Sequence, residues 1–338
     1  MFQYSKIMKN KLSQKIISLL LIIAACFACF FFASQKRISP KTESFQGYYF
    51  NTVVSFTFYN EKDASLHEEC FSLCQHYENL LSRTVEGSDI FNINHSNGEW
   101  ISVDAETYAL LQIAAQFCSQ TDGMLDYTVA PLMDLWNFTG SESEKKPPEH
   151  ALIQKALADV DYQKVELSDG KVRLINPNAK IDLGFIAKGY IGDKIRDYLI
   201  SQNVESAIIN LGGNILTIGQ KPDGKPYQIG IRNPKDKNTY LDTLSVTNQC
   251  VTTSGTYERM FLYDGIVYHH ILDPGTGMPI DTGLVSVTIL SDDATTGDAL
   301  STACLLLGTE KGLEFIKSFP NTNAIFVETD GTITSTLP

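Results

Sequence analysis

The chain has 338 residues, of which 43% are hydrophobic and 20% are charged, and this composition is typical of a folded domain rather than of a disordered chain. The formal net charge is −12 at pH 7, and an acidic chain lacks the basic footprint that nucleic-acid binding requires. We therefore expect no nucleic acid among its partners.

The first 33 residues differ in composition from the rest of the chain. Four lysines, at positions 6, 9, 11 and 15, precede an uncharged apolar run of 18 residues from 16 to 33. A basic segment followed by an apolar one is typical of export or membrane anchoring. We therefore expect a signal or anchor segment over 1–33, a polar linker over 34–46, and a single folded domain over 47–338 on the extracytoplasmic face of the cell membrane.

Two kinds of tether fit the apolar run. Its length falls between the roughly 20 residues of a membrane span and the roughly 7 to 15 of a cleaved signal. Ile23-Ala24-Ala25-Cys26 resembles a lipoprotein signal, in which the cysteine becomes the lipidated first residue, but residues 27–32 stay apolar where such proteins turn polar. A lipid anchor at Cys26 and an uncleaved N-terminal segment both remain open.

The cysteines form no pattern typical of disulfides or zinc. Cys70 and Cys74 are four residues apart in a helical pattern, without a second pair of ligands, so buried thiols are the favoured interpretation. The remaining cysteines beyond Cys29 have no paired spacing, which argues against a disulfide framework.

Hydrophobic spacing predicts runs of helices and runs of strands rather than a regular alternation of the two. This pattern favours an α+β fold with mixed or antiparallel sheets flanked by helices, as a single large catalytic domain behind the membrane-targeting segment. The predicted helices cover 64–81, 104–119, 151–160, 187–201, 294–307 and 311–319, and the predicted strands cover 53–59, 164–167, 172–175, 207–211, a strand-rich stretch over 227–290 and two short strands at the end.

Two segments carry the strongest chemical signal. Asp298 and Thr302 are four residues apart on a predicted helix, so both side chains lie on one helical face. A carboxylate and a hydroxyl together are hard oxygen ligands of the kind that hold Mg²⁺. The second segment, from Asp182 to Gly189, takes a strand through a tight turn into a helix, where free amides can bind phosphate. Taken alone, this second segment is more simply explained as an ordinary strand-to-helix turn.

Two later segments add candidate groups. On a strand, His269 and His270 face opposite sides, so at most one of them can reach a common site. A histidine near its normal pKa could take the proton of an attacking hydroxyl, although a pair of surface histidines is the simpler interpretation. Arg259 could pair with Glu258 on a solvated face or bind a phosphate. The turn at 210–214, which holds two glycines, either forms a bulge or lets a ligand approach the backbone.

These segments occur together in the order of one known family. They read I-D-L-G-F-I-A-K-G-Y, N-L-G-G-N, T-S-G-T-Y-E-R, H-I-L-D-P-G-T-G and D-A-L-S-T-A, and they follow G-M-L-D-Y-T-V-A-P-L-M-D-L-W-N-F upstream. With Asn51-Thr52 and residues 81–94, the sequence from about residue 50 to the end resembles the ApbE family of FAD:protein FMN transferases. Six motifs in order are far more specific than any one of them.

The resemblance implies an enzyme that transfers FMN from FAD to a Thr or Ser hydroxyl of a target protein and releases AMP. It implies Mg²⁺ held by Asp298, Thr302 and the backbone carbonyl of Ala187, and exported redox proteins as acceptors. His270 matches the family histidine thought to deprotonate the acceptor, and Asp298 is the second catalytic residue. The residues that the resemblance places at the FAD site are Thr52, Met124, Asp182, Lys188, Ser254, Gly255, Tyr257, Glu258, His270 and Ile271.

One position departs from the family, and two other functions stay open. Phe185 stands where the family commonly has Gly or Ala, and its ring either covers the flavin or packs into the core. The first alternative function is a Mg²⁺-dependent FAD pyrophosphatase, in which water replaces the acceptor hydroxyl. The second is a tethered flavin-binding lipoprotein without catalysis.

Overall fold

The computed structural model describes residues 41–141 and 145–337. The predicted signal or anchor segment, including Cys26, lies outside the described residues, as do residues 34–40 of the predicted linker. Lys41–Pro338 form one compact unit. No helix of the described residues is long and apolar enough to cross a bilayer.

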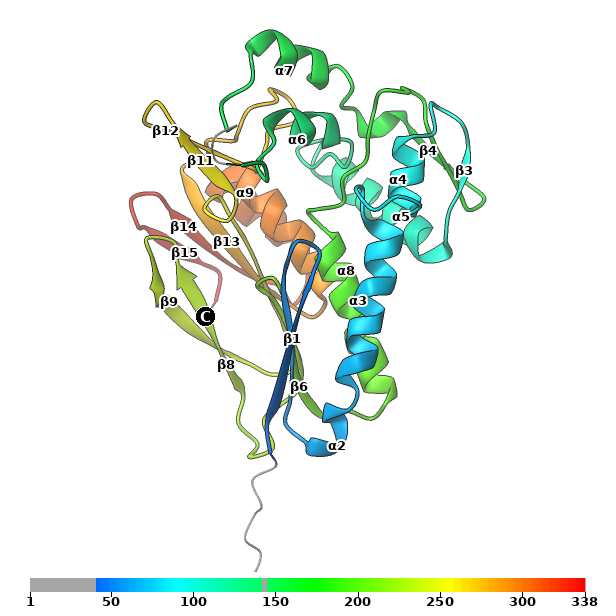
Figure 1. Cartoon of the computed structure of the whole chain (residues 1–338). Helices are drawn as coiled ribbons and strands as arrows, with labels where there is room; N and C mark the ends of the chain where they lie inside the picture. The colour runs from blue at the N-terminus through cyan, green and yellow to red at the C-terminus, as the bar shows by residue number, and fades with distance from the viewer. Residues whose placement is uncertain (1–40, 142–144, 338) are drawn as a thin grey trace, which may run out of the picture. The chain divides into compact units, whose positions relative to one another are not determined.

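A large antiparallel sheet is the centre of the unit (Figure 1). Eight strands of the described residues form it, in the order β1-β2-β6-β7-β10-β13-β14-β15, and all neighbouring strands are antiparallel. Their bounds are β1 (Glu43–Tyr49), β2 (Thr52–Phe58), β6 (Ser206–Leu211), β7 (Asn214–Gly219), β10 (Cys250–Gly255), β13 (Leu284–Ser291), β14 (Asn323–Glu328) and β15 (Ile333–Ser335).

Three smaller antiparallel sheets surround the main one. They are β3 (Ile101–Ser102) with β5 (Lys171–Leu174) and β4 (Val165–Ser168), then β8 (Tyr227–Asn233) with β9 (Asp236–Val246), and β11 (Met260–Tyr263) with β12 (Ile266–His269). The helices are α2 (Glu61–Ala64), α3 (His67–Leu81), α4 (Asp89–Asn94), α5 (Ala105–Gln120), α6 (Ala130–Trp136), α7 (His150–Leu157), α8 (Ala187–Ser201) and α9 (Ala294–Ile316), with a short 3₁₀ turn at Tyr162–Lys164.

Alternating side chains of the sheet strands divide between two cores. On β14, Ala324 and Phe326 belong to the main core, which α3, α5, α8 and α9 cover, whereas Ile325 and Val327 belong to a second core under the β8–β9 hairpin. This period of two follows from the pleat of a strand. The sheet is therefore covered by helices on one face and, over its β10–β14 part, by a hairpin on the other (Figure 1).

The structure confirms the predicted fold class and most of the predicted elements. Gly308 has φ 78° and breaks α9 where the sequence predicted a gap between two helices. Strand β1 begins at Glu43, inside the stretch interpreted as a linker. The sequence did not indicate α4 and α6, which have six and seven residues, because such short helices depend on tertiary contacts more than on periodicity.

Every cysteine of the described residues is a buried free thiol. Burial raises the pKa of Cys70 and of Cys74 to about 12. The prediction that this pair forms buried thiols is confirmed.

Helices α8 and α9 cross in close contact at Gly189. A Cβ atom on Gly189 would lie 2.1 Å from the backbone oxygen of Ala294 and 2.8 Å from the Cβ atom of Asp298. Glycine is needed here because no side chain fits between the two backbones. Gly192, one turn further along α8, faces the ends of the Leu216 and Leu211 side chains and no backbone atom of a neighbouring element.

We expect Gly189→Ala to destabilise the fold by about 1 to 3 kcal/mol, because the added methyl group forces α8 away from α9. Gly192→Ala is the matched control on the same helix. Both variants gain about 1 kcal/mol of helix propensity, but only at Gly192 does the added methyl group meet side-chain ends instead of a backbone, so the control should cost much less. Urea unfolding of the two variants checks the difference. Equal stability of both would contradict the close contact.

Candidate active site

One end of the main sheet gathers the glycine-rich turns. The register pairs Val54 with Leu211 and Val251 with Ile215, so the start of β2, the β6–β7 turn and the end of β10 lie at the same end. Thr52 packs against Gly212, where a Cβ atom would approach its hydroxyl within 2.6 Å. Thr52 therefore lies beside the paired glycines.

The N-terminus of α9 is fixed by a carboxylate from α8. Asp193 accepts hydrogen bonds from the backbone N–H groups of Ala294 and Thr295 at 2.9 and 2.8 Å, and from the Thr295 hydroxyl at 2.6 Å. Asp293 caps the same helix by accepting from the backbone N–H of Thr296. These bonds satisfy amides that a helix start leaves free, and they fix the position of the next turn, which carries Asp298.

Asp298 is the most buried carboxylate of the predicted site, with 2% of its surface exposed. Its Oδ2 accepts a hydrogen bond from the backbone N–H of Gly189 at 2.9 Å and lies 3.5 Å from the Nζ of Lys188. Its Oδ1 accepts no hydrogen bond from any described residue. The carboxylate therefore keeps one oxygen available for a further ligand.

Thr302 lies one turn after Asp298, and its hydroxyl is part of a short chain of hydroxyl groups. The Thr302 Oγ1 is 2.9 Å from the Oγ of Ser254, which is 2.7 Å from the Oγ of Ser301. Ser254 is the penultimate residue of β10, so this chain joins α9 to the glycine-rich end of the sheet. Ser301 was not predicted as a site residue, because nothing in the sequence pattern distinguishes it from other serines on a helix.

The donor set fits a hard divalent cation better than a soft one. The described residues contain no group of three His, Cys, Asp or Glu that could hold a metal ion. The available atoms are instead one carboxylate oxygen of Asp298 and the Thr302 hydroxyl. Oxygen ligands of this kind suit Mg²⁺, which keeps several waters or phosphate oxygens in its shell.

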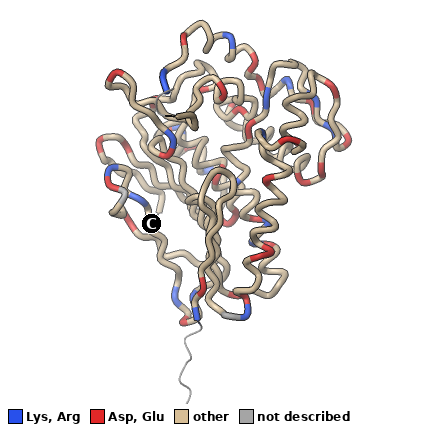
Figure 2. Tube along the Cα trace, in the orientation of Figure 1, with Lys and Arg blue, Asp and Glu red and all other residues tan. Residues whose placement is uncertain are grey.

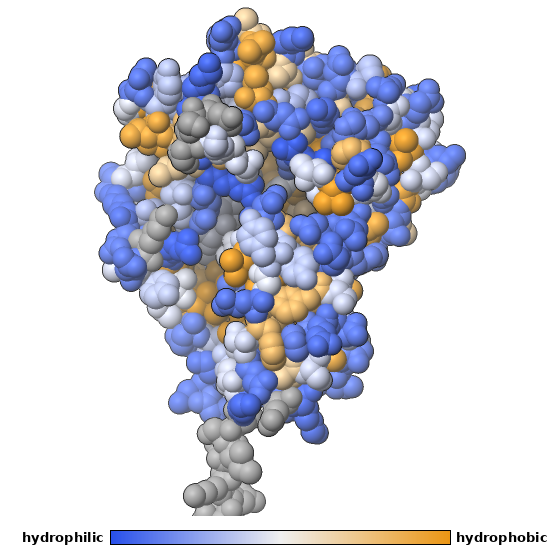
Figure 3. Space-filling model, in the orientation of Figure 1, coloured by the Kyte–Doolittle hydropathy of each residue, from blue (hydrophilic) through white to orange (hydrophobic). Residues whose placement is uncertain are grey.

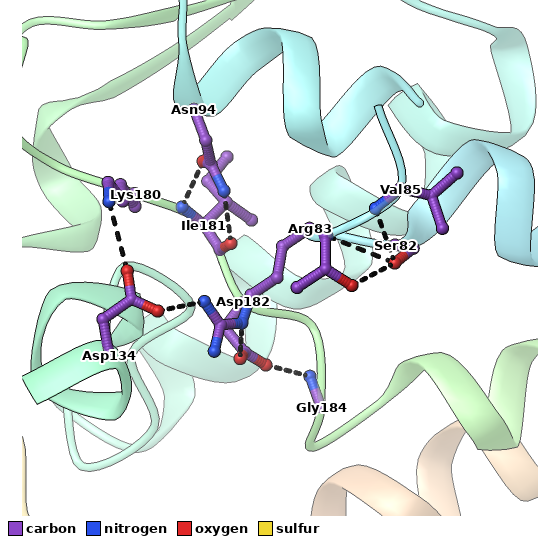
Figure 4. Close-up of polar contacts among 10 residues, drawn as sticks. Ser82, Arg83, Val85, Asn94, Asp134, Lys180, Ile181, Asp182 and Gly184 are labelled. Carbon is purple, nitrogen blue, oxygen red and sulfur yellow. Dashed lines mark hydrogen bonds and ion pairs between the residues drawn. The ribbon is translucent and has the colours of Figure 1, made fainter. Parts of the chain in front are cut away.

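Asp182 stabilises the turn before α8 (Figure 4). Its Oδ2 lies 2.8 Å from the Nε of Arg83, and its Oδ1 accepts from the backbone N–H of Gly184 at 2.7 Å. Arg83 also contacts Asp134, which pairs with Lys180 at 3.1 Å. Both oxygens of Asp182 are therefore engaged within the protein, and the carboxylate holds the turn in place.

Asn94 holds the strand-like segment just before this turn (Figure 4). Its side-chain amide donates to the backbone oxygen of Ile181 at 2.9 Å and accepts from the backbone N–H of the same residue at 2.6 Å. The backbone N–H of Asp182 donates to the Tyr127 oxygen at 2.8 Å. The turn is thus positioned by three separate segments of the chain.

His270 lies next to the cationic groups of the site. Its Nδ1 is 3.3 Å from the backbone oxygen of Arg259, and its backbone N–H donates to the same oxygen at 3.0 Å. Burial lowers the pKa of His270 to about 3, with further contributions from the charges of Arg259, His269 and Lys188. The ring is therefore neutral at neutral pH. The Nε2 of His269 lies 3.1 Å from the Ile280 oxygen instead, so the two rings have different partners.

Comparison with known proteins identifies the family. The family model described as "ApbE family" matches residues 50–326 of the chain. A protein of Klebsiella pneumoniae named "FAD:protein FMN transferase" is 39% identical over 271 residues, which cover 78% of this chain and 83% of that protein. The chain belongs to the ApbE family. A protein of Treponema pallidum with the same name is 35% identical over 280 residues, which cover 78% of this chain and 77% of the relative.

Solved structures of ApbE proteins share the fold. The ApbE protein of Thermotoga maritima is 35% identical and superposes with a TM-score of 0.80, covering 87% of this chain and 96% of that one. The structure titled flavin transferase ApbE from Vibrio cholerae has a TM-score of 0.78 at 27% identity, with the same coverage. The recognition made from the ordered motifs is confirmed.

Three residues that the ApbE resemblance places at the FAD site lie in different surroundings. Glu258 is exposed and pairs with Arg232 at 3.5 Å instead of with Arg259, which forms no ion pair among the described residues. Ile271 is buried in the main core and accepts from the backbone N–H of Ile280. Met124 follows the turn after α5, three residues before Tyr127, which contacts the Asp182 segment.

Tyr257 and Phe185 are two aromatic residues of the ApbE motifs. Tyr257 packs on Gly255, where a Cβ atom would approach the ring within 2.7 Å, and burial raises the pKa of its hydroxyl. Phe185 packs against the main core and keeps part of its surface exposed. The bulky ring at the departure from the family pattern is thus accommodated by the core.

Proposed function

We propose that this chain is an FAD:protein FMN transferase that uses Mg²⁺ to move FMN from FAD to a Thr or Ser hydroxyl of an exported redox protein and releases AMP. The enzyme class is the activity named for relatives that are 39% and 35% identical. The arrangement of Asp298 beside Gly189, Lys188 and Thr302 is the observation that carries it.

The residues at the site match the needs of phosphoryl transfer. Such reactions depend on positioning and on stabilising the charge of the transferred group. Asp298, Thr302 and the Ala187 carbonyl would hold Mg²⁺, which when bound offsets charge on the pyrophosphate of FAD. Lys188 supplies a positive charge at the same place, 3.5 Å from Asp298.

His270 is the proposed general base. The acceptor hydroxyl oxygen forms a bond to the FMN phosphorus, the bond from that phosphorus to the bridging oxygen breaks, and AMP leaves with this oxygen. The neutral His270 ring takes the hydroxyl proton. A bound pyrophosphate adds negative charge near the ring, which opposes the effect of Lys188 and makes the ring a stronger base than in the empty site.

A direct experiment separates the three candidate functions. The full chain is incubated with FAD and MgCl₂, with and without a membrane extract from cells that lack this protein, and products are followed by AMP release and by flavin fluorescence of protein bands. A fluorescent band that depends on the extract supports the transferase. Rapid AMP release without extract would identify a pyrophosphatase. If neither AMP nor a fluorescent band forms, the protein is a flavin binder.

We expect Asp298→Ala to lower transfer by at least about 100-fold, because it removes the only carboxylate proposed to hold the cation. The melting temperature of the wild type should rise with MgCl₂, and that of the variant should not. Glu314→Ala is the matched control, since Glu314 is an exposed carboxylate on the same helix. Wild-type transfer by Asp298→Ala would contradict the metal site.

We expect His270→Ala to slow transfer by about 10²- to 10⁴-fold, the usual contribution of a positioned base. Because the pKa of His270 is about 3, kcat/KM of the wild type should stay constant between pH 5 and pH 7, whereas an unshifted histidine would lose activity below about 6.5. His95→Ala, at an exposed histidine, serves as the control. A loss below tenfold would place the base elsewhere.

We also propose that the enzyme works tethered to the extracytoplasmic face of the membrane. The basic residues and the apolar run of residues 1–33 support this location. Deletion of residues 1–33 should release the protein from the membrane fraction, and mass spectrometry of the mature N-terminus should find either acylated Cys26 or intact Met1. Release of the full-length chain without detergent would contradict the tether.

A further inference from the structure

The β11–β12 hairpin ends directly at His270. Its four-residue strands are joined by Asp264 and Gly265, both with positive φ, which is the two-residue turn favoured in hairpins. At the other end, the backbone N–H of His270 donates to Arg259, which immediately precedes β11. At about 3.3 Å per residue, each strand spans about 13 Å. Any group bound along this ribbon is therefore close to the proposed base.

One face of the hairpin is packed against the rest of the protein. Phe261 and Tyr268 lie opposite each other, with ring centroids 5.4 Å apart, and both rings contact Trp136 at 6.4 and 5.5 Å. Phe138 completes the group at 5.7 Å from Phe261. This aromatic cluster fixes the orientation of the hairpin on α6.

The opposite face of the hairpin is apolar and exposed except at His269, which is buried opposite Met260. Leu262 and Val267 form a cross-strand pair on it, with 69% and 51% of their surfaces exposed, and Met260 lies beside them. The two strands contain no charged residue, and Figure 2 shows charge on this hairpin only at its turn. Figure 3 shows apolar surface over the same region at the upper left. A ribbon with one packed face normally carries polar residues on the other, so an exposed apolar face indicates a binding surface.

Among the described residues, no backbone group bonds to the outer edges of the hairpin at Leu262 or Val267. In an antiparallel pair, hydrogen-bonded and non-hydrogen-bonded positions alternate. Arg259 and His270 are a bonded position, so Leu262 and Val267 fall on a non-bonded one, and their backbone N–H and C=O groups point outward. β11 and β12 have no third strand among the described residues. An extended segment could therefore add to either edge.

We propose that the β11–β12 hairpin is the docking surface for the acceptor protein, which adds an extended apolar segment along Leu262 and Val267 and so brings its hydroxyl to His270. This inference rests on the proposed transferase activity, because only a transferase needs a protein substrate at this base. Continuity of the ribbon with His270 favours the acceptor over other occupants. A lipid surface at the same place would bring the bilayer, instead of a hydroxyl, to the base.

The test compares a variant of the exposed hairpin face with a variant of an exposed apolar residue elsewhere on the protein. Leu262→Thr/Val267→Thr keeps strand propensity but removes most of the apolar face. Ile333→Thr on β15 is the matched control, because Ile333 is a strand residue with 48% of its surface exposed. Full-length proteins in detergent are given FAD and MgCl₂, and flavin labelling is measured over a range of membrane-extract concentrations. FAD affinity is measured in parallel from quenching of flavin fluorescence.

We expect the double variant to label acceptors about tenfold more slowly at low extract concentration and to approach the wild-type rate at high concentration. Its FAD affinity and the behaviour of the control should not change. Equal labelling by wild type and double variant at every concentration would overturn the docking proposal while leaving the transferase intact. Absence of any labelled band with the wild type would instead defeat the transferase proposal and, with it, this inference.

A lipid contact is tested separately. Tyr263→Trp is placed in the full chain in phosphatidylethanolamine–phosphatidylglycerol vesicles that contain brominated acyl chains. Bromine quenches tryptophan only at close range, so an acceptor-binding hairpin should keep its emission. Strong quenching would show that the hairpin enters the membrane and would overturn the proposal.

Discussion

The crossing of α8 and α9 is the constraint on which the site depends. Asp193 of α8 caps the first turn of α9, and Gly189 lets the two backbones meet, so the backbone N–H of Gly189 reaches Asp298 at 2.9 Å. Two contacts one turn apart fix both the rotation and the translation of α9 against α8. The oxygen ligands are therefore positioned by the packing of two long helices, which is more rigid than a loop.

The glycine-rich end of the main sheet also supports the site. Ser254 bonds to Thr302 from β10, and the Asp182 turn is held by Arg83 and by the Tyr127 backbone oxygen. These contacts come from segments far apart in the chain, and each one engages a residue of an ApbE motif or its direct neighbour. The ordered motifs thus describe one connected structure, which explains why their order is informative.

The sequence predicted the parts of the site that depend on local periodicity. The spacing of Asp298 and Thr302 placed both on one helical face, and the two adjacent histidines were expected to face apart. Contacts between distant segments could not be predicted: Asp193 lies 101 residues from Ala294, and its spacing to Arg196 is typical of a solvated ion pair. The resemblance placed Asp182 at the FAD site but could not show that its two oxygens contact Arg83 and Gly184. Strand β1 was missed because a polar, serine-containing edge strand has the composition of a linker.

The buried cysteines have a consequence for the environments that the domain can tolerate. Thiolate is the reactive form of cysteine, and the raised pKa of Cys70, Cys74 and Cys304, about 12 in each case, leaves almost none at neutral pH. The buried thiols should therefore react slowly with oxidants and thiol reagents in the folded state. The described part of the fold therefore holds together without a disulfide bond, and its thiols are protected by burial instead of by a reducing environment.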